Sequence, residues 1–324
     1  MRVLVTGGSG FIGSALCKKL LAAGYQVRIL DNHSRGALAK LGQELDRVEV
    51  VEGDITHLDT VRRAAEGCEM LWHLAYINGT RYFYERPDAV LEVAVKGSIN
   101  TLDAALAVGV RRYVLASSSE VYNQPTRLPT DETERLLIPD VRNPRFSYGG
   151  GKIAAELLTL HYGGRRGLET VIFRPHNFYG PDMGFEHVIP EVVKRIMDLS
   201  SGLTVKEIDL PIQGDGSETR AFCYVEDGAD GILLAGIHGL SGEIYHVGVE
   251  EEISIRQLIE AIGQILAIKL NLQPGIVREG APSRRCPAID KLKALGYVPR
   301  FSFAEGIRNT VLWYARHYQQ GRQG

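Results

Sequence analysis

A tyrosine and a lysine stand four residues apart in this chain, at Tyr148 and Lys152. Within a helix, this spacing places both side chains on one face. The ordinary pKa of tyrosine, about 10, is too high for a base at neutral pH, but a nearby ammonium group favours the phenolate. A phenolate could take the proton of a hydroxyl group whose carbon gives a hydride to a cationic nicotinamide, while Ser118 hydrogen-bonds the same oxygen. Such a pair is more often two surface residues, so the interpretation depends on the rest of the chain.

The first residues form a short apolar run that turns on glycines. Val3–Val5 has the composition of a strand that is buried on both faces. Gly7 and Gly10 follow, and an apolar-periodic segment then continues to Gly24. A strand, a glycine turn and a helix in this order let backbone amides approach a pyrophosphate at the positive end of the helix. Asp31 ends the next apolar run, at the spacing expected of a carboxylate that binds a ribose.

The composition is that of an ordinary globular protein. The chain has 324 residues, 44% of them hydrophobic, and a formal net charge of −2, which predicts no nucleic-acid partner. We expect no membrane partner, because no apolar run approaches the roughly 20 residues of a membrane span and the chain begins with a strand rather than a signal peptide. The cysteines are scattered without metal-ligand spacing, which predicts no metal site and a reducing, cytoplasmic setting. They are Cys17, Cys68, Cys223 and Cys286.

Strand-like and helical segments alternate through the first half of the chain. Apolar runs predict strands over 3–5, 26–31, 48–51, 70–75, 113–117 and 170–174. Helical periodicity is found after the first glycines and over 59–66, 87–108 and 147–162. This alternation predicts an α/β fold in which a doubly wound parallel sheet is covered by helices on both faces.

The pattern becomes less regular after Pro175, where prolines and glycines divide the chain into shorter pieces. Helices are expected over 190–198, 254–266 and 303–318, with Ser254 as an N-cap. We therefore predict a dinucleotide-binding Rossmann domain over 1–175 and a smaller substrate-binding domain over 176–324. Some strands of the second domain could return to the first sheet.

Several short motifs occur in the order in which the extended short-chain dehydrogenase/reductases carry them. They are Thr6-Gly-Gly-Ser-Gly-Phe-Ile-Gly13, His73-Leu-Ala75, Ser117-Ser-Ser-Glu-Val-Tyr122, Tyr148-x-x-x-Lys152 and Arg174-Pro-x-Asn-x-x-Gly-Pro181. Along nearly its whole length, the chain resembles the NAD-dependent nucleotide-sugar epimerases and dehydratases of that family. The resemblance implies an enzyme that uses NAD and acts on a nucleotide-diphosphate sugar, with a UDP-sugar favoured.

The resemblance also implies roles for individual positions. The cofactor-binding positions are Gly7, Gly10, Phe11, Ile12, Gly13, Asp31, Asn32, Asp54, Ile55, Leu74, Ala75, Tyr148 and Lys152. The catalytic positions are Ser118, Glu120, Tyr148 and Lys152. The substrate-binding positions are Tyr76, Ser119, His176, Asn177, Arg220 and Arg285, and the forked donors of the two arginines suit a diphosphate. We expect the polar loop over 76–82 to contact the sugar.

Two residues indicate opposite choices of cofactor. A carboxylate at Asp31 would repel the 2′-phosphate of NADP, whereas Arg35 in the following loop could accept that phosphate. The loop resembles that of NAD-using members, so NAD is favoured.

The reaction depends on the fate of a 4-keto sugar, because oxidation at C4 is the first step that the resemblance implies. A 4-epimerase returns the hydride to the other face of the ketone and needs no further acid or base. A 4,6-dehydratase removes the C5 proton and expels the 6-hydroxyl group. A hexuronate decarboxylase releases carbon dioxide, because the ketone lies β to the C6 carboxylate.

Glu120 favours chemistry at C5 and C6. Ser118-Ser-Glu-Val-Tyr122 resembles a stretch of the UDP-glucuronate decarboxylases, whereas simple 4-epimerases usually have small residues at the glutamate position. Ser119 stands where dehydratases of the dTDP-glucose type have an aspartate. Two positions depart from the decarboxylases, with Ser118 in place of threonine and Asn123 in place of glycine. Decarboxylation, or a related 4,6-dehydration, is our first expectation, and a 4-epimerase of a UDP-hexose or UDP-hexuronate is the alternative close behind it. Glu120 could also be an ordinary loop carboxylate that is solvated or salt-bridged.

Two further expectations concern class and assembly. A non-catalytic dinucleotide sensor of this fold typically lacks the tyrosine or the lysine of the catalytic pair, and this chain has both. The helices over 87–108 and 147–162 resemble the pair that forms a four-helix dimer interface in the family. A homodimer is therefore expected.

Overall fold

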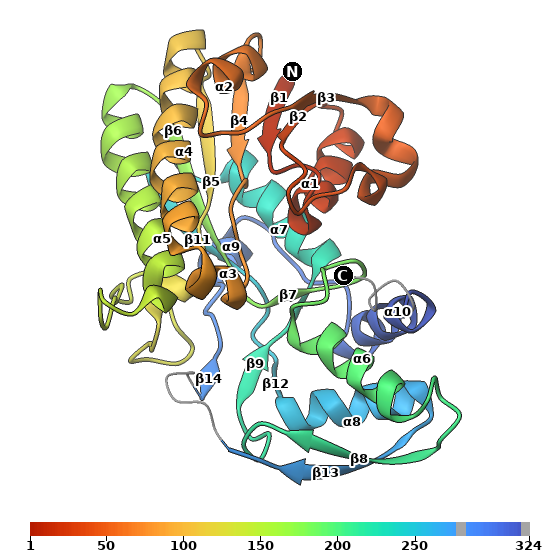
Figure 1. Cartoon of the computed structure of the whole chain (residues 1–324). Helices are drawn as coiled ribbons and strands as arrows, with labels where there is room; N and C mark the ends of the chain where they lie inside the picture. Colours follow the sequence, from red (N-terminus) through yellow and green to blue (C-terminus); the bar gives the residue numbers. More distant parts are fainter. Residues whose placement is uncertain (277–282, 319–324) are drawn as a thin grey trace.

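The computed structural model describes residues 1–276 and 283–318. A seven-stranded sheet flanked by helices forms one part of the molecule, and three helices with short sheets form the other (Figure 1). The first part contains most of the first half of the chain. The second part lies across one end of the large sheet.

The large sheet is entirely parallel and has the strand order β11-β6-β5-β4-β1-β2-β3. Its strands are β1 (Arg2–Thr6), β2 (Gln26–Asp31), β3 (Val48–Glu52), β4 (Met70–His73), β5 (Arg112–Ala116), β6 (Glu169–Pro175) and β11 (Glu243–Val247). The order reverses between β1 and β4. In open sheets of this kind, ligands bind beyond the carboxyl ends of the strands at such a reversal.

Alternate side chains of the strands pack against different helical layers. Val3 and Val5 are buried against α1 (Phe11–Ala22) and α7 (Val225–His238). Leu4 is buried in a second cluster, which includes side chains of three helices on the opposite face. These helices are α2 (Leu58–Ala65), α4 (Pro87–Val108) and α5 (Ser147–Leu157). Since side chains alternate along a strand, the apolar run predicted from sequence is buried on both faces, and the doubly wound α/β fold is confirmed.

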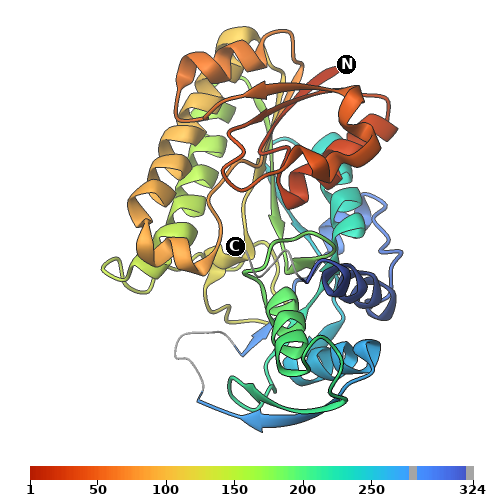
Figure 2. The same ribbon diagram turned by 45° about the vertical axis from the view of Figure 1, so that its right-hand side comes forward.

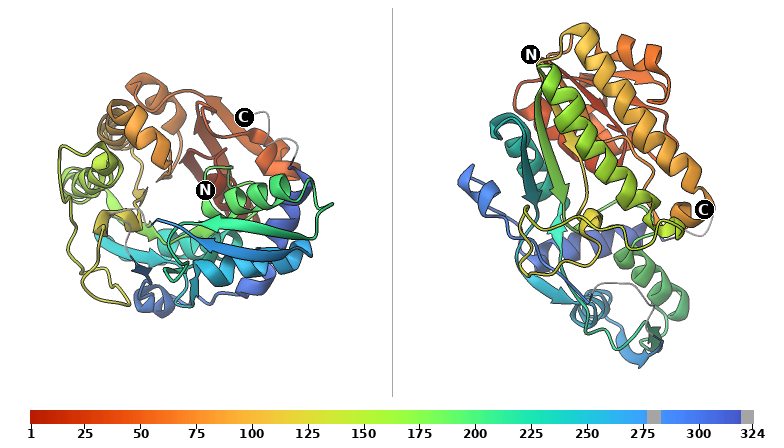
Figure 3. Two further views of the ribbon diagram at one scale, coloured as in Figure 1. Left: turned by 60° about the horizontal axis from the view of Figure 1, so that its bottom comes forward. Right: turned by 90° about the vertical axis from the view of Figure 1, so that its left-hand side faces the viewer.

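The ends of two predicted elements differ in the structure. β4 stops at His73 rather than residue 75, because the amides of Leu74 and Ala75 turn to donate hydrogen bonds to Thr6. The helix predicted over 147–162 is α-helical only to Leu157 and then continues as a π-helical turn. The long helix α4 has the predicted bounds. In Figure 3, α4 and α5 lie side by side along one face of the molecule.

A separate hydrophobic core holds the second part together. Helices α6 (Val188–Leu199), α8 (Ile255–Leu266) and α10 (Phe303–Arg316) pack against one another and against Leu210. Figure 2 shows the three helices together in the lower part of the molecule. Ser254 caps α8, as predicted, in a reciprocal capping box with Gln257.

The remaining elements are short. The strands are β7 (Phe178–Tyr179), β8 (Glu207–Ile212), β9 (Thr219–Ala221), β10 (Cys223–Tyr224), β12 (Glu252–Ser254), β13 (Lys269–Pro274) and β14 (Arg284–Arg285). The helices are α3 (Thr80–Glu85) and α9 (Asp290–Ala294). Although β11 follows residue 176, it forms an edge of the large sheet beside β6. Over residues 1–276 and 283–318, the helices include none that combines the length and apolar character needed to cross a membrane.

Helix α7 approaches the sheet closely at Gly236, where an added Cβ atom would overlap the fully buried ring of Trp72. We predict that Gly236→Ala lowers the free energy of unfolding by about 1–3 kcal/mol, the usual cost of overpacking. Chemical denaturation monitored by tryptophan fluorescence would measure the change. Gly164→Ala is the control, because its Cβ atom would meet neighbours at ordinary distances of 3.6 Å or more. An equal loss in both variants would contradict the prediction.

Candidate active site

The glycine turn after β1 leaves room for a ligand beside bare backbone. Gly7 has a φ of +73°, and a Cβ atom there would lie 2.7 Å from the backbone of Ala75. A Cβ atom at Gly13 would overlap the carbonyl oxygen of Gly7. Helix α1 begins directly after Gly10 without a side-chain cap, so its first amides point towards the turn. This arrangement suits the pyrophosphate of a dinucleotide.

Two carboxylates organise the far end of the same cleft. Asp31 accepts hydrogen bonds from the backbone amides of Ser9 (3.0 Å) and His33 (2.9 Å). Asp54 accepts a hydrogen bond from the side chain of Asn32 (2.8 Å). Burial alone would raise the pKa of the Asp54 carboxyl, but its hydrogen bonds with Thr56 and Asn32 hold that pKa below its ordinary value. Both acidic groups are thus placed where an adenosine ribose and base are expected.

The loop after β2 is tied to the second part of the molecule across the cleft. Arg35 forms an ion pair with Glu186 (3.2 Å), and its guanidinium lies over the ring of Tyr82. Lys40 binds the side chain (2.5 Å) and the carbonyl oxygen (2.9 Å) of Asp182. The charge of Arg35, which could have favoured NADP, is therefore already paired with a carboxylate. We call the segment 182–187 the strap, because it is held by these ion pairs and four of its residues, Asp182, Met183, Gly184 and His187, line the same cavity as the glycine turn.

A cavity of about 490 Å³ contains all the positions predicted to bind the cofactor. These are Gly7, Gly10, Phe11, Ile12, Gly13, Asp31, Asn32, Asp54, Ile55, Leu74, Ala75, Tyr148 and Lys152. Tyr76 and residues of the strap also line this cavity. The bare glycine turn at one side and the carboxylates at the other make the cavity fit a dinucleotide. The described ranges, 1–276 and 283–318, contain no group of three or more histidine, cysteine, aspartate or glutamate side chains that could hold a metal ion.

Aromatic side chains surround the tyrosine–lysine pair. The ring of Tyr148 stacks on Phe83 (4.9 Å between centroids) and meets Tyr76 edge-on (5.1 Å). The ammonium group of Lys152 lies 3.7 Å from the centroid of the Tyr76 ring and donates a hydrogen bond to the carbonyl oxygen of Ala116 (2.7 Å). Tyr76 thus contacts both members of the pair, a position that its place in the sequence did not reveal.

Burial dominates the protonation of this pair. It raises the pKa of Tyr148 to about 12, although a hydrogen bond with Ser118 acts in the opposite direction. It also lowers the pKa of Lys152 to about 7, although the carboxylate of Glu156 partly compensates. The sequence predicted that an ammonium group lowers the pKa of Tyr148, but in the structure this pKa is raised. The ammonium group of Lys152 lies over the ring of Tyr76 and 5.9 Å from the centroid of the Tyr148 ring. A further positive charge beside Tyr148 would favour its phenolate.

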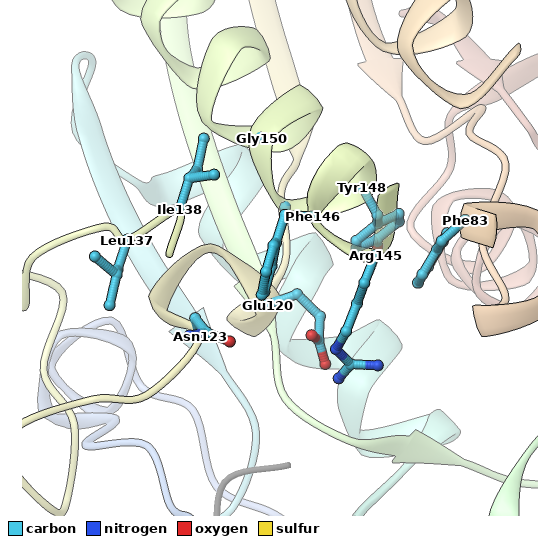
Figure 4. Close-up of a pocket in the computed structure, with 10 residues that line it drawn as sticks. Phe83, Glu120, Asn123, Leu137, Ile138, Arg145, Phe146, Tyr148 and Gly150 are labelled. Carbon is cyan, nitrogen blue, oxygen red and sulfur yellow. The ribbon is translucent and has the colours of Figure 1, made fainter. Parts of the chain in front are cut away.

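Glu120 lies near Tyr148 and is surrounded by three arginines. It forms an ion pair with Arg285, and Figure 4 shows Arg145 directed towards its carboxylate. Burial alone would raise the pKa of the Glu120 carboxyl, but Arg285, Arg145 and Arg220 together hold it below its ordinary value. Glu120 is therefore a carboxylate at neutral pH. It is salt-bridged, as one sequence interpretation allowed, but the salt bridge lies beside Tyr148 rather than on a remote loop.

Strand pairing brings together two residues that lie far apart in the sequence. β9 and β14 pair in parallel, with Arg220 directly opposite Arg285. Burial and the neighbouring charge of Arg285 lower the pKa of Arg220 to about 10. Two adjacent guanidinium groups make a good site for a dianion. This is the juxtaposition that the predicted diphosphate role requires.

Three other predicted substrate residues have distinct surroundings. His176 is buried, and neither of its ring nitrogens has a hydrogen-bond partner among residues 1–276 and 283–318. Burial, His246 and Arg285 hold the pKa of His176 well below its ordinary value, so the ring is neutral. Asn177 has a φ of +44°, and its amide reaches the carbonyl oxygen of Ala221 at 3.5 Å. Ser119 is buried next to Ser118.

The loop over 76–82 was predicted to contact the sugar, and the structure places only some of its residues on the wall of the large cavity. Tyr76 and Asn78 line the large cavity. Arg81 instead points to solvent and pairs with Glu85 on α3, so it is not part of the cavity wall. Tyr82 carries the guanidinium of Arg35 on its ring.

A chain of buried polar groups behind the site was not recognised from the sequence. Arg174 donates hydrogen bonds to both oxygens of Glu156 (2.8 and 2.6 Å) and one to the hydroxyl of Tyr122. Ser117 donates a hydrogen bond to the same Glu156 carboxylate. The hydroxyl of Tyr122 lies 2.5 Å from Nε2 of His246. The sequence signals were Arg174 at the end of an apolar strand and Glu156 one turn after Lys152, and only the fold shows that they meet.

The parallel sheet with its reversal, the glycine turn and the tyrosine–lysine pair define a dinucleotide-dependent enzyme of the Rossmann class. Sequence comparison matches residues 3–248 to the "NAD dependent epimerase/dehydratase family". The UDP-N-acetyl-alpha-D-glucosaminuronate decarboxylase of Bacillus cytotoxicus is 31% identical over 325 residues, which cover 97% of each chain. The UDP-glucose 4-epimerase of Mycolicibacterium smegmatis is 33% identical over 327 residues, covering 98% of this chain and all of that protein. The dTDP-glucose 4,6-dehydratase DesIV of Streptomyces venezuelae, solved with NAD bound, is 31% identical with a TM-score of 0.86, covering 99% of this chain and 98% of that one.

The chain therefore belongs to the NAD-dependent epimerase/dehydratase family. It is an enzyme of this nucleotide-sugar-modifying family, and its cofactor is NAD. These identifications confirm the resemblance seen in the sequence and exclude the sensor alternative. The three similar proteins catalyse three different reactions, so family membership leaves the specific reaction open.

The strap predicts how firmly the cofactor is held. We expect Lys40→Gln to raise the dissociation constant of NAD about two- to fivefold at low salt, because it removes one part-exposed ion pair. Calorimetric titration of the protein with NAD would measure the constant. Raised ionic strength should reduce the difference from wild type, since salt screens the pair. Lys19→Gln is the matched control, because Lys19 pairs with Glu226 and Asp230 between α1 and α7; an equal effect in both variants would contradict this role of the strap.

Proposed function

We propose that this enzyme oxidises a UDP-hexuronate at C4 and then removes its C6 carboxylate, with UDP-glucuronate as the first substrate to test. The observation that carries the proposal is the Glu120 carboxylate, held by Arg285 beside Tyr148. A simple 4-epimerase needs no second acid–base group, whereas a reaction at C5 does. The similarity to a UDP-N-acetyl-alpha-D-glucosaminuronate decarboxylase supports the same choice.

The first step is assigned to Tyr148, Ser118 and Lys152. Ser118 and Tyr148 are hydrogen-bonded to each other, so a sugar hydroxyl group could bind between their oxygens. Tyr148 takes the proton from this hydroxyl group as the general base. NAD supplies the hydride acceptor when it is bound, held by the glycine turn, Asp31 and Lys152. Because burial raises the pKa of Tyr148, we expect full activation of the phenol only when positive charge lies beside it.

The second step uses the position of the new ketone. The bond between C5 and C6 breaks, its electron pair moves towards the C4 carbonyl group, and carbon dioxide leaves. The resulting enolate needs a proton at C5, which we assign to transfer from water through Glu120. Return of the hydride to C4 and of the proton from Tyr148 to the C4 oxygen then gives a product that differs from the substrate by carbon dioxide alone. Arg220 and Arg285 would meanwhile hold the diphosphate, since they are paired across two strands and the charge of Arg285 acts on Arg220. Ser119, Tyr76, His176 and Asn177 are proposed to surround the sugar.

Two other reactions remain candidates for this site. The similarity to a UDP-glucose 4-epimerase over the whole chain favours epimerisation of a UDP-hexose or UDP-hexuronate as the alternative. A 4,6-dehydratase would use Glu120 on the C5 proton, and DesIV has a similar fold. Ser119, however, offers no acid for a leaving 6-hydroxyl group. We also propose the division into a cofactor domain over 1–175 and a substrate domain over 176–324.

The mass of the product distinguishes the three reactions. We expect the NAD-loaded enzyme to convert UDP-glucuronate to a product that has lost carbon dioxide, as detected by mass spectrometry. Tyr148→Phe should slow turnover by about 10²–10⁴-fold, the usual contribution of a general base, while NAD binding is retained. Loss of water from UDP-glucose would instead support dehydration. A product of unchanged mass and altered stereochemistry would support epimerisation and overturn decarboxylation.

Glu120→Gln separates the two steps. We predict that it lowers steady-state release of carbon dioxide by about 10²-fold or more, because the enzyme stalls after the first turnover when the enolate cannot be protonated at C5. Oxidation at C4 should persist and be visible as absorbance of bound NADH after substrate is added. Glu44→Gln is the control, since Glu44 pairs with Arg47 within the same segment. Unchanged turnover in Glu120→Gln would contradict a role of Glu120 in proton transfer and leave it only its salt bridge with Arg285.

A homodimer is proposed through α4 and α5, which lie side by side on the surface (Figure 3). Three large apolar side chains of this face are exposed, Leu91 (42%), Val95 (37%) and Leu157 (55%). We predict that light scattering gives twice the chain mass and that Val95→Glu converts the protein to monomer, because a charge would be buried at the interface. Leu240→Glu, at an exposed position outside these helices, should leave the dimer intact. A monomeric wild-type protein would contradict the proposal.

A further inference from the structure

We propose that Arg145 determines the substrate class of this enzyme by binding the C6 carboxylate of the sugar. Arg145 lies three residues before Tyr148, in the short 3-10 helix Pro144–Phe146 that leads into α5. The side chain of Asn143 fixes the start of this helix by accepting a hydrogen bond from the amide of Arg145 (3.0 Å). The inference rests on the proposed function, because it assumes that the C4 hydroxyl group binds at Tyr148.

The guanidinium of Arg145 is unusual among the arginines near the site. Arg174 is paired with Glu156, Arg35 with Glu186, and Arg285 with Glu120. Over residues 1–276 and 283–318, the Arg145 guanidinium makes no hydrogen bond or ion pair, although it is close enough to lower the pKa of the Glu120 carboxyl. A fork of donors beside the reaction site is therefore available to a ligand.

The space beside Arg145 is too small for a sugar ring. Arg145, Glu120, Phe83 and Tyr148 are among the residues that line a pocket of about 10 Å³, together with apolar side chains such as Leu137 (Figure 4). This is roughly the room needed by one water molecule, so the pocket admits one oxygen of a carboxylate and not the whole group. If C4 lies at the Tyr148 hydroxyl, an exocyclic group of the sugar ring can reach this pocket while the ring remains outside it.

The charge of the sugar decides which exocyclic group gains from Arg145. The diphosphate is assigned to Arg220 and Arg285, and Arg285 is also paired with Glu120. A UDP-hexuronate carries a charged group at C6 that Arg145 attracts, whereas a UDP-hexose carries none there. The planar fork of arginine matches the two oxygens of a carboxylate. A neutral 6-hydroxyl group would gain much less from the same residue.

The test compares ligands that differ at a single carbon. Calorimetric titration of the NAD-loaded enzyme would measure binding of UDP-glucuronate, UDP-glucose and UDP-N-acetylglucosamine. We expect Arg145→Gln to weaken UDP-glucuronate by about thirtyfold or more, the usual cost of losing a charge-assisted contact, and to change the other two by less than about twofold. Arg145→Lys should recover part of the loss. Arg142→Gln is the matched control. Arg142 lies three residues before Arg145, is exposed and pairs with Asp140.

Each outcome decides between the alternatives. Equal weakening of all three ligands, or no weakening of UDP-glucuronate, would overturn the role of Arg145, and so would a wild-type enzyme that does not bind UDP-glucuronate. A selective effect on UDP-N-acetylglucosamine would place Arg145 at C2 and also overturn it. If wild type binds UDP-glucuronate through Arg145 but releases no carbon dioxide, the decarboxylase proposal fails and the binding of the C6 carboxylate by Arg145 stands. If wild type releases carbon dioxide and Arg145→Gln binds UDP-glucuronate as wild type does, the decarboxylase proposal stands and the role of Arg145 fails.

Discussion

The ion pair between Arg174 and Glu156 connects the parts that build the active site. Both side chains are almost completely buried, at 2% and 3% exposure. Ionised groups are costly to remove from water, and such a pair gains little net stability even when its geometry is good. Each partner here has additional hydrogen bonds, to Ser117 on one side and to Tyr122 on the other. We infer that the pair is retained because it fixes the geometry of the elements that meet there.

Those elements carry the reacting groups. Ser117 precedes Ser118 at the end of β5, and Glu156 lies one turn after Lys152 on α5. Tyr122 continues the network to His246 on β11, whose Nδ1 lies 3.1 Å from the carbonyl oxygen of Ala288, close in sequence to Arg285. The same buried charges therefore connect the tyrosine–lysine pair with the strand that carries Arg285, which we propose binds the diphosphate. A site assembled from several strand ends needs such a connection, because no single element determines its geometry.

Local patterns in the sequence predicted the parts of the molecule that depend on local structure. The turn from β1 to α1 needs residues without side chains at Gly7 and Gly13, so its glycines are visible in the sequence. The bounds of α4 follow from apolar periodicity between Pro87 and the left-handed Gly109. The sequence allowed some strands of the second domain to return to the first sheet but did not identify β11 as one of them. Its apolar run is short, and only its pairing with β6 distinguishes it from the strands of the second part.

The chemistry of the site depends on contacts that local patterns do not encode. Arg285 reaches Glu120 across 165 positions of sequence because β14 pairs with β9. A resemblance to related enzymes identified Glu120 and Arg285 separately, but not that they neutralise each other. Arg145, by contrast, has no side-chain hydrogen bond or ion pair among residues 1–276 and 283–318, although it lies close to Glu120. In the proposed function, the choice of substrate depends on this guanidinium group, and its availability follows from tertiary contacts rather than from local sequence.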